Sequence, residues 1–261
     1  MPLIIFVAFI FVWYFPVWAR QGKGNRLPVR PILRSVLAGM FPVFFAALII
    51  QILLGNLYRA LSVPYLMNKA LSSYVDVALV EEGFKFLGAY LIIRKLDPQR
   101  KSDYILIFGA VGLGFEITET LLELDSPLAG AVRGMFAMHI IWEFWMGSFF
   151  WEYRQRRKPG FLLLSLAVPF VLHGTNDFLC FVGLDQLPFL DEELPAGLNA
   201  AKDLSARMNH PEDWILALAL FMILQLAFQI YTYCMALRAS RETRETANSV
   251  SDENPDTSSV S

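Results

Sequence analysis

Two glutamates and a lysine lie in the middle of a stretch that is otherwise apolar enough to cross a membrane. The stretch is VALVEEGFKFLGAYLII, and its ionisable residues are Glu81, Glu82 and Lys85. A charged side chain at the centre of a bilayer costs about 2.5–3.5 kcal/mol on insertion scales, so it normally meets a partner or a water-filled cavity. On a helix, Lys85 shares a face with both glutamates. One lysine neutralises one glutamate, which leaves the other to carry a proton or bind a ligand.

Three further apolar stretches carry ionisable pairs at helical spacing. They are GLGFEITE with Glu116 and Glu119, RGMFAMHIIWEF with His139 and Glu143, and LHGTNDF with His173 and Asp177. A carboxylate one turn from a histidine can orient the imidazole, or bind the same metal beside it. Gly112 and Gly114, just before the glutamate pair, would let another helix approach closely.

The elements that must position these groups are membrane-spanning helices. The chain has 261 residues, 56% of them hydrophobic, and a mean hydropathy of +0.46, which excludes an ordinary soluble domain. Backbone groups in lipid must bond internally, so the spans must be helical and the predicted fold is an all-α, multi-pass bundle. We count seven candidate spans, at about 2–19, 35–57, 72–93, 103–122, 131–152, 160–182 and 213–237.

The distribution of basic residues gives an orientation. Arginine and lysine cluster after the first, third, fifth and seventh candidate spans, so all four clusters share one side of the membrane. Basic loops face the cytoplasm, which predicts an outside N-terminus and a cytoplasmic C-terminus. We therefore predict a transmembrane domain over 1–238, with an acidic extracytoplasmic loop at 183–212. The polar tail at 239–261 is predicted to be disordered.

This orientation places the ionisable groups at one level. Counting from the predicted span boundaries at ~1.5 Å per residue, Glu81, Glu119, His139 and His173 all lie roughly 5–14 Å below the outer surface. Four helices are thus predicted to bring carboxylates and imidazoles together in the outer half of the membrane.

These motifs resemble those of the PrsW family of intramembrane proteases. EEGFK fits E-E-x-x-K, FEITE fits F-x-x-x-E, HGTND fits H-x-x-x-D, and His139 lies in a further expected histidine-bearing span. The resemblance runs from about Ala70 to Phe181, a motif core of about 70–182. The CAAX-processing and bacteriocin-immunity membrane proteases resemble the chain more distantly. Relative to their motifs, Lys85 stands one position earlier than an arginine, Glu119 replaces a histidine, and Asp177 replaces an asparagine.

The PrsW resemblance implies hydrolysis of a peptide bond in or near the membrane. The expected substrate is a single-pass regulatory protein such as an anti-sigma factor, and the expected location is the bacterial cytoplasmic membrane, with no nucleic-acid partner. The family is usually classed as metalloprotease, which implies a divalent metal, with zinc expected. The wider superfamily includes members argued to use glutamate-activated water without a metal. The sequence holds no H-E-x-x-H, so the usual zinc-protease helix is absent.

The residues suit either mechanism, since peptide hydrolysis needs a nucleophilic water and a stabilised oxyanion. The catalytic candidates are Glu81, Glu82 and Lys85; the metal candidates are Glu119, His139, His173 and Asp177; the supporting candidates are Glu116, Glu143 and Asn176. The histidines could hold a metal with Glu119 or Asp177, or donate to the oxyanion. The spacing of four favours Glu81 as the partner of Lys85 and Glu82 as the base.

Two other classes of function compete with a protease. Carboxylate and histidine chains also form proton relays, so a proton- or ion-coupled transporter is one alternative. Against it, the ionisable groups gather at one depth, and we see no inverted repeat. The other alternative is a non-catalytic membrane scaffold of the same fold, against which the intact motifs argue.

Overall fold

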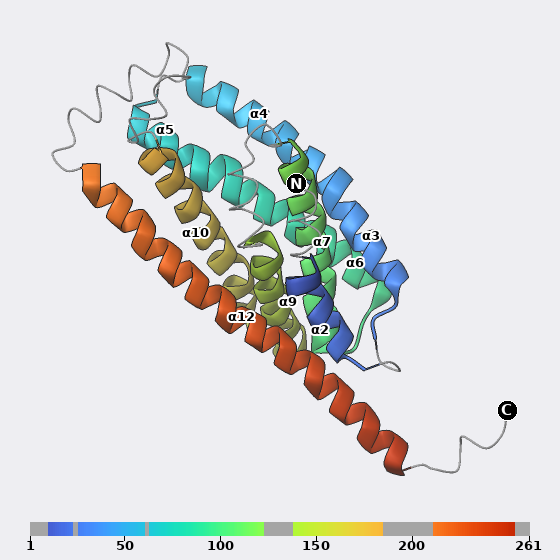
Figure 1. The fold of residues 1–261 in the computed structure, drawn as a ribbon. Helices are drawn as coiled ribbons and strands as arrows, with labels where there is room; N and C mark the ends of the chain where they lie inside the picture. The colour runs from blue at the N-terminus through green and yellow to red at the C-terminus, as the bar shows by residue number, and fades with distance from the viewer. Residues whose placement is uncertain (1–9, 23–25, 61–62, 123–137, 185–210, 254–261) are drawn as a thin grey trace.

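The computed structural model of the protein describes residues 10–22, 26–60, 63–122, 138–184 and 211–253, and all regular structure in these ranges is helical (Figure 1). The α-helices are α2 (Phe15–Arg20), α3 (Val29–Ala38), α4 (Phe44–Ala60), α5 (Tyr65–Leu71), α6 (Val80–Leu96), α7 (Lys101–Leu122), α9 (Met138–Arg156), α10 (Pro159–Leu184) and α12 (Pro211–Glu253). Three π-helical segments accompany them: η1 (Ile10–Tyr14), η2 (Gly39–Val43) and η3 (Ser72–Leu79).

Two of the π-helical segments join α-helices into longer rods. η2 lies between α3 and α4 and contains Pro42, whose ring leaves no N–H for the regular helical bond. A wider turn is a common response to such an interruption. η3 lies between α5 and α6, so it leads directly into the turn that carries Glu81 and Glu82.

The chain reverses sharply after α6 and after α9. Asp97 ends α6 in the left-handed conformation, at φ 44°, and Pro98 follows it. Arg157 has φ 54° after α9, and Pro159 opens α10. A left-handed residue and a nearby proline are common at helix ends, because proline cannot continue the preceding helix but suits the first position of the next.

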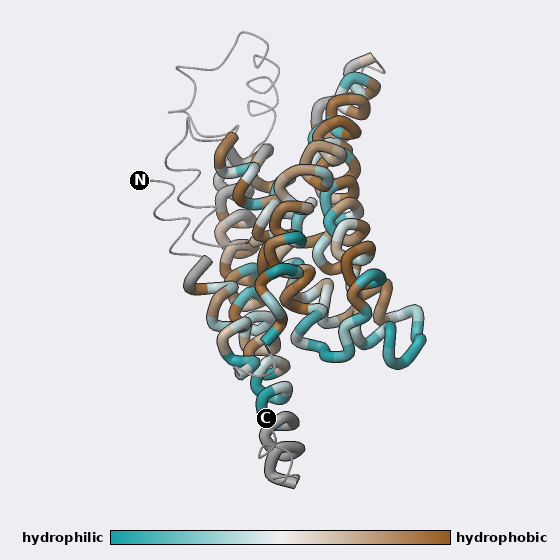
Figure 2. The backbone as a smooth tube through the Cα atoms, turned by 90° about the vertical axis from the view of Figure 1, so that its right-hand side faces the viewer, coloured by the Kyte–Doolittle hydropathy of each residue, from teal (hydrophilic) through white to brown (hydrophobic). Residues whose placement is uncertain are grey.

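The structure is that of a helical membrane protein. Among the described helices, four are long and apolar enough to cross a membrane: Val29–Tyr58, Lys101–Leu122, Pro159–Cys180 and Ala219–Glu245. Figure 2 shows apolar residues along the helices and polar residues concentrated at one end of the bundle. These helices correspond to four of the seven predicted spans. The other three lie at 2–19, of which residues 2–9 are outside the described residues, and at 72–93 and 131–152, which contain charged groups. The seven-span count and the N-out orientation stay predictions.

Helix α7 is the centre of the bundle. Every residue from Ser102 to Glu116 is buried, and the helix packs against α3, α6, α9 and α12. The predicted close approach at its glycines is confirmed. A Cβ at Gly112 would lie 2.6 Å from the carbonyl oxygen of His139 in α9, and one at Gly114 would lie 2.0 Å from that of Val36 in α3.

The last helix is longer than predicted. Residues 239–261 were expected to be disordered, but α12 continues as a helix to Glu253, so this prediction is wrong for 239–253. Two contacts lie in the first part of this extension. Arg241 donates to Glu245 one turn later at 2.8 Å, and the hydroxyls of Thr243 and Ser102 lie 2.9 Å apart, which ties α12 to the start of α7. Residues 185–210, most of the predicted acidic loop, lie outside the described residues.

Candidate active site

The structure brings the predicted site residues of four helices into one cluster. They are Glu81, Glu82 and Lys85 from α6, Glu116 and Glu119 from α7, His139 and Glu143 from α9, and His173, Asn176 and Asp177 from α10. Most are buried, because the four helices pack around them. Residues up to 96 positions apart in the sequence thus share a single polar interior.

Lys85 connects the cluster, and its pairing differs from the prediction in one detail. Its Nζ lies 2.6 Å from Glu82 Oε1 but 3.8 Å from Glu81 Oε2. Lys85 thus forms ion pairs with both glutamates, and the shorter one is with Glu82, where the sequence favoured Glu81. Both helical spacings allow contact, so tertiary neighbours decide between them: His139 Nδ1 lies 2.8 Å from the ammonium nitrogen, and the Phe115 ring lies 4.6 Å from it. The ammonium is held on the Glu82 side by these two contacts.

His173 is held at both ring nitrogens. Its Nδ1 lies 2.8 Å from Glu82 Oε1, so the imidazole donates to this carboxylate when Nδ1 is protonated. Its Nε2 lies 3.3 Å from Asp177 Oδ2 and 3.9 Å from Glu81 Oε2. The Trp142 ring packs on the imidazole at 4.7 Å between centroids. A histidine whose Nδ1 donates to a carboxylate presents Nε2 in a fixed direction, as in many metal sites.

His139 lies beside His173, with 5.1 Å between the ring centroids. Its Nε2 is 2.9 Å from Glu119 Oε2. Its backbone N–H donates to Glu116 Oε2 at 3.3 Å, and His139 is the second residue of α9. The first N–H groups of a helix have no partner within the helix. Glu116 therefore secures the start of α9 and with it the position of His139.

The other two supporting candidates also lie at the cluster. Glu143 is completely buried, with Glu82 and Lys85 as its charged neighbours. It fits there because Gly112 faces it, since a Cβ on that glycine would lie 2.6 Å from Glu143 Cγ. Asn176 donates through Nδ2 to Asp177 Oδ1 at 3.2 Å, so it helps to orient the carboxylate beside His173.

Sequence reasoning missed Gln51. This residue lies on α4, and its Nε2 donates to Glu81 Oε1 at 2.9 Å. A neutral amide carries no charge to mark it in an apolar stretch. The available signal was weaker: glutamine side chains within spanning helices commonly hydrogen-bond across to another helix.

Glu81, His139 and His173 form a group that could hold a metal ion. Each offers one ligand atom, and these atoms all lie within 4.8 Å of one another. Two imidazole nitrogens and one carboxylate oxygen form a donor set found in catalytic zinc sites. Glu81 Oε2, moreover, is buried without a hydrogen-bond partner among the described residues. The residues therefore fit a divalent metal, with Glu81 in the place where the sequence pointed to Glu119 or Asp177.

Comparison with known proteins identifies the family of the chain. The family model described as PrsW family intramembrane metalloprotease matches residues 27–190. Its range is wider than the predicted 70–181, since it includes α3 and α4 and hence Gln51. No solved structure matches the chain.

Three curated relatives carry the name Protease PrsW. The protein from Geobacillus kaustophilus is 26% identical over 160 residues, covering 58% of this chain and 68% of the relative. The one from Clostridioides difficile is 25% identical over 180 residues, covering 63% and 74%. The one from Shouchella clausii is 29% identical over 120 residues, covering 43% and 55%. Since the family model spans more than half of the chain, the protein belongs to the PrsW family of intramembrane proteases and is a peptidase.

Proposed function

We propose that the protein hydrolyses a peptide bond of a single-pass membrane protein, in or near the membrane. The main support is that Glu81, His139 and His173 lie close together, beside the buried Glu82–Lys85 pair. Family membership supports the reaction, and the resemblance supports a regulatory substrate such as an anti-sigma factor. The apolar helices around the cluster support a location within the bacterial cytoplasmic membrane.

Glu81, His139 and His173 would hold a divalent metal, for which we propose zinc. When bound, such an ion polarises the scissile carbonyl and lowers the pKa of water. The Nδ1 of His173 is taken up by Glu82, so His173 would bind through Nε2, which lies 3.9 Å from Glu81 Oε2. Asp177 Oδ2 lies nearer to this nitrogen, at 3.3 Å, and would have to move aside. His139 binds through Nε2 only after its contact with Glu119 is rearranged.

Glu82 positions His173 in this proposal. Its Oε1 lies within hydrogen-bond distance of both Lys85 Nζ and His173 Nδ1. The other oxygen, Oε2, has no hydrogen-bond partner among the described residues, but only 2% of the side chain is exposed, so an incoming water has little access to it. This arrangement revises the expectation that Glu82 is the base. The pair with Lys85 instead stabilises the carboxylate that fixes the orientation of His173.

Glu119 is the carboxylate that we assign as general base. Its side chain is 20% exposed, compared with 14% for Asp177, 6% for Glu81 and 2% for Glu82. It is therefore the most accessible of these four to an incoming water. It would take a proton from the water and return it to the leaving amine nitrogen. Asp177 would accept from Asn176 Nδ2 on the other side of the site.

Reconstituted protein tests the proposal. The full chain in nanodiscs is mixed with a library of fluorogenic single-pass peptides, and products are identified by mass spectrometry. We expect cleavage by the wild type, loss of cleavage with a chelator, and recovery on adding zinc. Failure to cleave any library member would end the protease proposal for this chain. Full activity of metal-free protein would end the metal assignment but leave the peptidase intact.

Two variants separate the proposed roles. Glu119→Gln keeps the shape of the side chain and removes its basicity, so cleavage should fall by about 10²–10⁴-fold while bound metal is retained. Glu81→Ala removes a ligand, so elemental analysis should show less bound metal. Loss of metal in Glu119→Gln together with full retention in Glu81→Ala would reverse the two assignments.

A further inference from the structure

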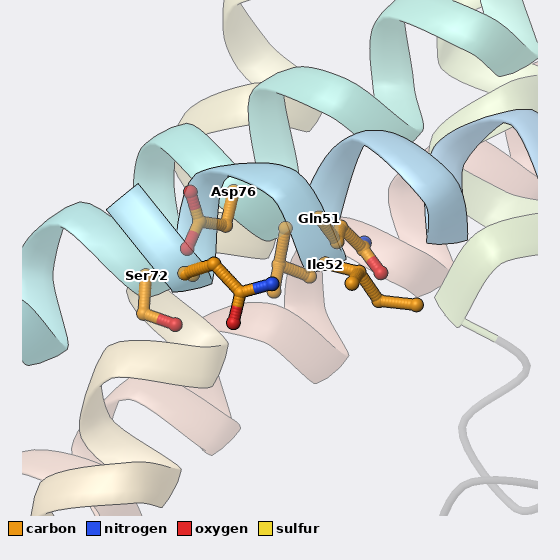
Figure 3. Close-up of a pocket in the computed structure, with 7 residues that line it drawn as sticks. Gln51, Ile52, Ser72 and Asp76 are labelled. Carbon is orange, nitrogen blue, oxygen red and sulfur yellow. The ribbon is translucent and has the colours of Figure 1, made fainter. Parts of the chain in front are cut away.

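A pocket opens between α4 and η3. Its volume is about 310 Å³, at the lower end of the range for ligand sites. Figure 3 shows Gln51 and Ile52 from α4 and Ser72 and Asp76 from η3 around it. The remaining lining residues are Gly55, Asn56 and Val77. The pocket therefore combines apolar walls with amide, hydroxyl and carboxylate groups.

Asp76 is the group in the pocket that needs a partner. Its side chain is buried, with 4% of the residue exposed, and the Tyr58 hydroxyl hydrogen-bonds to the carboxylate. Its Oδ1, however, has no hydrogen-bond partner among the described residues. A buried acceptor without a donor costs about 1–3 kcal/mol, so native proteins rarely leave one unmatched. A donor supplied by a bound ligand would satisfy it.

Gln51 joins the pocket to the cluster. The same side chain lines the pocket and donates through Nε2 to Glu81 Oε1 at 2.9 Å. A ligand in the pocket therefore lies next to a residue that holds a candidate metal ligand. The π-helical turns of η3 form the opposite wall, and such turns are frequent at functional sites.

The exposed face of α4 indicates that a ligand would reach the pocket from the membrane. Ile49, Ile52 and Leu53 expose more than half of their surface, as expected for residues that face lipid. A substrate helix in the membrane has all its backbone groups bonded internally, and a helical peptide bond must be unwound before it is hydrolysed. Each N–H freed by unwinding needs a new acceptor, because lipid supplies none.

We propose that this pocket is a subsite for an unwound segment of the substrate, next to the scissile bond, with Asp76 accepting a backbone N–H and Gln51 coupling occupancy to Glu81. The inference rests on the proposed function and adds the place where the substrate binds. It assigns Asp76 to binding and Gln51 to positioning, and neither residue touches the scissile bond.

Filling the pocket tests this directly. A Cβ at Gly55 would meet nothing within 4 Å, so Gly55→Leu places a side chain in the pocket without a backbone clash. Gly160→Leu is the matched control, because a Cβ there also meets nothing and Gly160 lies at the start of α10, outside the pocket. The reporter is the library peptide that the wild type cleaves fastest. We expect KM to rise by about tenfold or more in Gly55→Leu with kcat little changed, and no change in Gly160→Leu.

Asp76→Ala should raise KM in the same way, while Gln51→Leu should lower kcat as well, because it removes a bond to Glu81. Unchanged KM in both Gly55→Leu and Asp76→Ala would overturn the subsite.

Photocrosslinking gives a readout besides turnover. Benzoylphenylalanine is placed at Asn56 in the pocket, or at Leu53 on the lipid-facing side of the same helix, in the Glu119→Gln background. Stronger capture of the reporter at position 56 supports the subsite. Equal capture at both positions, or capture of lipid alone at position 56, overturns it. If the wild type cleaves no peptide, the proposed function fails and this inference fails with it. Cleavage that is insensitive to the pocket variants removes only the subsite.

Discussion

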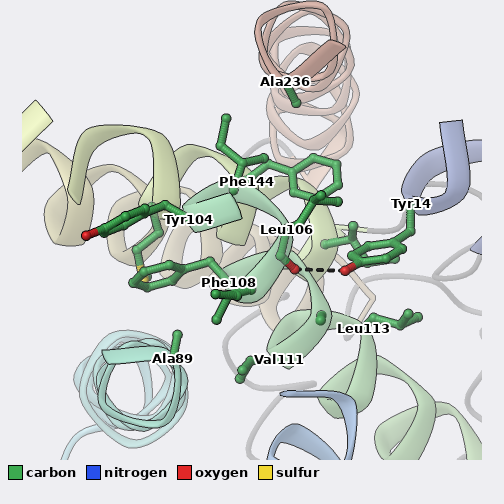
Figure 4. Packing of buried hydrophobic residues seen from close by; sticks show 14 of the residues in the cluster. Tyr14, Ala89, Tyr104, Leu106, Phe108, Val111, Leu113, Phe144 and Ala236 are labelled. Atoms are coloured by element: carbon green, nitrogen blue, oxygen red, sulfur yellow. Dashed lines mark hydrogen bonds between the residues drawn. The ribbon is translucent and has the colours of Figure 1, made fainter. Parts of the chain in front are cut away.

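The two halves of the α7–α9 pair differ sharply in chemistry although they belong to the same two helices. At one end, Tyr104, Phe108 and Phe150 pack as apolar rings, with centroids of successive pairs about 6 Å apart. Figure 4 shows Tyr104 and Phe108 in this half, together with Phe144 of α9 and Tyr14 of η1. At the other end, the same helices carry Glu116, Glu119, His139 and Glu143.

The difference shows how a polar site is held within a membrane bundle. Interior packing is dense and resists change in shape, so the apolar half fixes the separation and register of the two helices. Gly109 allows this contact, because a Cβ there would lie 2.2 Å from a ring carbon of Phe144. The polar half can then keep groups that repel or lack partners, since its helices are already positioned. Substitutions in the polar half should therefore change activity or charge balance, and those in the apolar half should change stability.

The largest expected effect is on activity in the polar half. His173→Asn removes the imidazole that contacts Glu82, Asp177 and Trp142. Cleavage of the reporter peptide should fall by about 10²–10⁴-fold or more, the range that a positioned catalytic group contributes. The protein should still be recovered folded, as judged by circular dichroism and size-exclusion chromatography, because the apolar half is untouched. Residual activity within tenfold of the wild type would contradict a direct role for His173.

The second effect combines charge and stability. Glu82→Gln leaves Lys85 buried with a weakened partner. Removing one member of a buried ion pair typically lowers the free energy of unfolding by about 3–5 kcal/mol, and we expect a loss of this size here. Lys85→Met should be similarly costly. The double variant should recover much of the lost Tm, because neither charge is then stranded, but it should not recover cleavage. Additive losses of Tm in the double variant would show that the 2.6 Å pair does not couple the two residues.

The sequence was sufficient to predict that the site exists, since an ionisable side chain in an apolar helix needs a partner. The 2.8 Å contact between Glu82 and His173 and the 2.9 Å contact between His139 and Glu119 are such partnerships. Helical spacing also correctly placed Asp177 beside His173. It could not decide which glutamate pairs with Lys85, because spacings of three and four both permit contact and His139 from another helix determines the outcome.

Other features depend on tertiary structure alone. Gln51 is neutral, so nothing in its local sequence connects it with Glu81, 30 residues later. The pocket between α4 and η3 likewise forms only when these two helical segments pack together. The spacing of apolar residues in the sequence does not predict that contact. The extension of α12 includes a contact between Thr243 and Ser102, 141 residues apart. The disorder of residues 239–261 was predicted from their polar composition, which gives no information on that contact.

The third prediction concerns the apolar half. Gly109→Leu forces a side chain into the space occupied by the Phe144 ring. Overpacking of a dense core costs about 1–3 kcal/mol, so Tm measured by scanning fluorimetry in detergent should fall clearly. Gly160→Leu, whose Cβ meets nothing, is the control and should leave Tm nearly unchanged. An unchanged Tm in Gly109→Leu would mean that the α7–α9 contact is looser than the structure shows.

The smallest effect isolates a single hydrogen bond. Tyr14 donates its hydroxyl to the carbonyl oxygen of Leu106 at 2.9 Å, and both residues are buried in the apolar half (Figure 4). Tyr14→Phe keeps the ring and removes the bond, so it should cost about 0.5–1.5 kcal/mol. Tyr233→Phe is a matched control, because its hydroxyl donates to Val12 at 2.8 Å on the exposed side of the bundle. In detergent, water reaches an exposed carbonyl more readily than the buried carbonyl of Leu106, so the loss of Tm should be smaller.

The Tyr14 variant also tests the division between the two halves. Tyr14 hydrogen-bonds to Leu106, on the part of α7 that precedes Glu116 by more than two turns. Its kcat and KM for the reporter peptide should therefore match those of the wild type at temperatures well below Tm. A tenfold fall in kcat without a fall in Tm would show that the apolar half tunes the chemistry directly, and the separation of stability from activity along α7 and α9 would then be wrong.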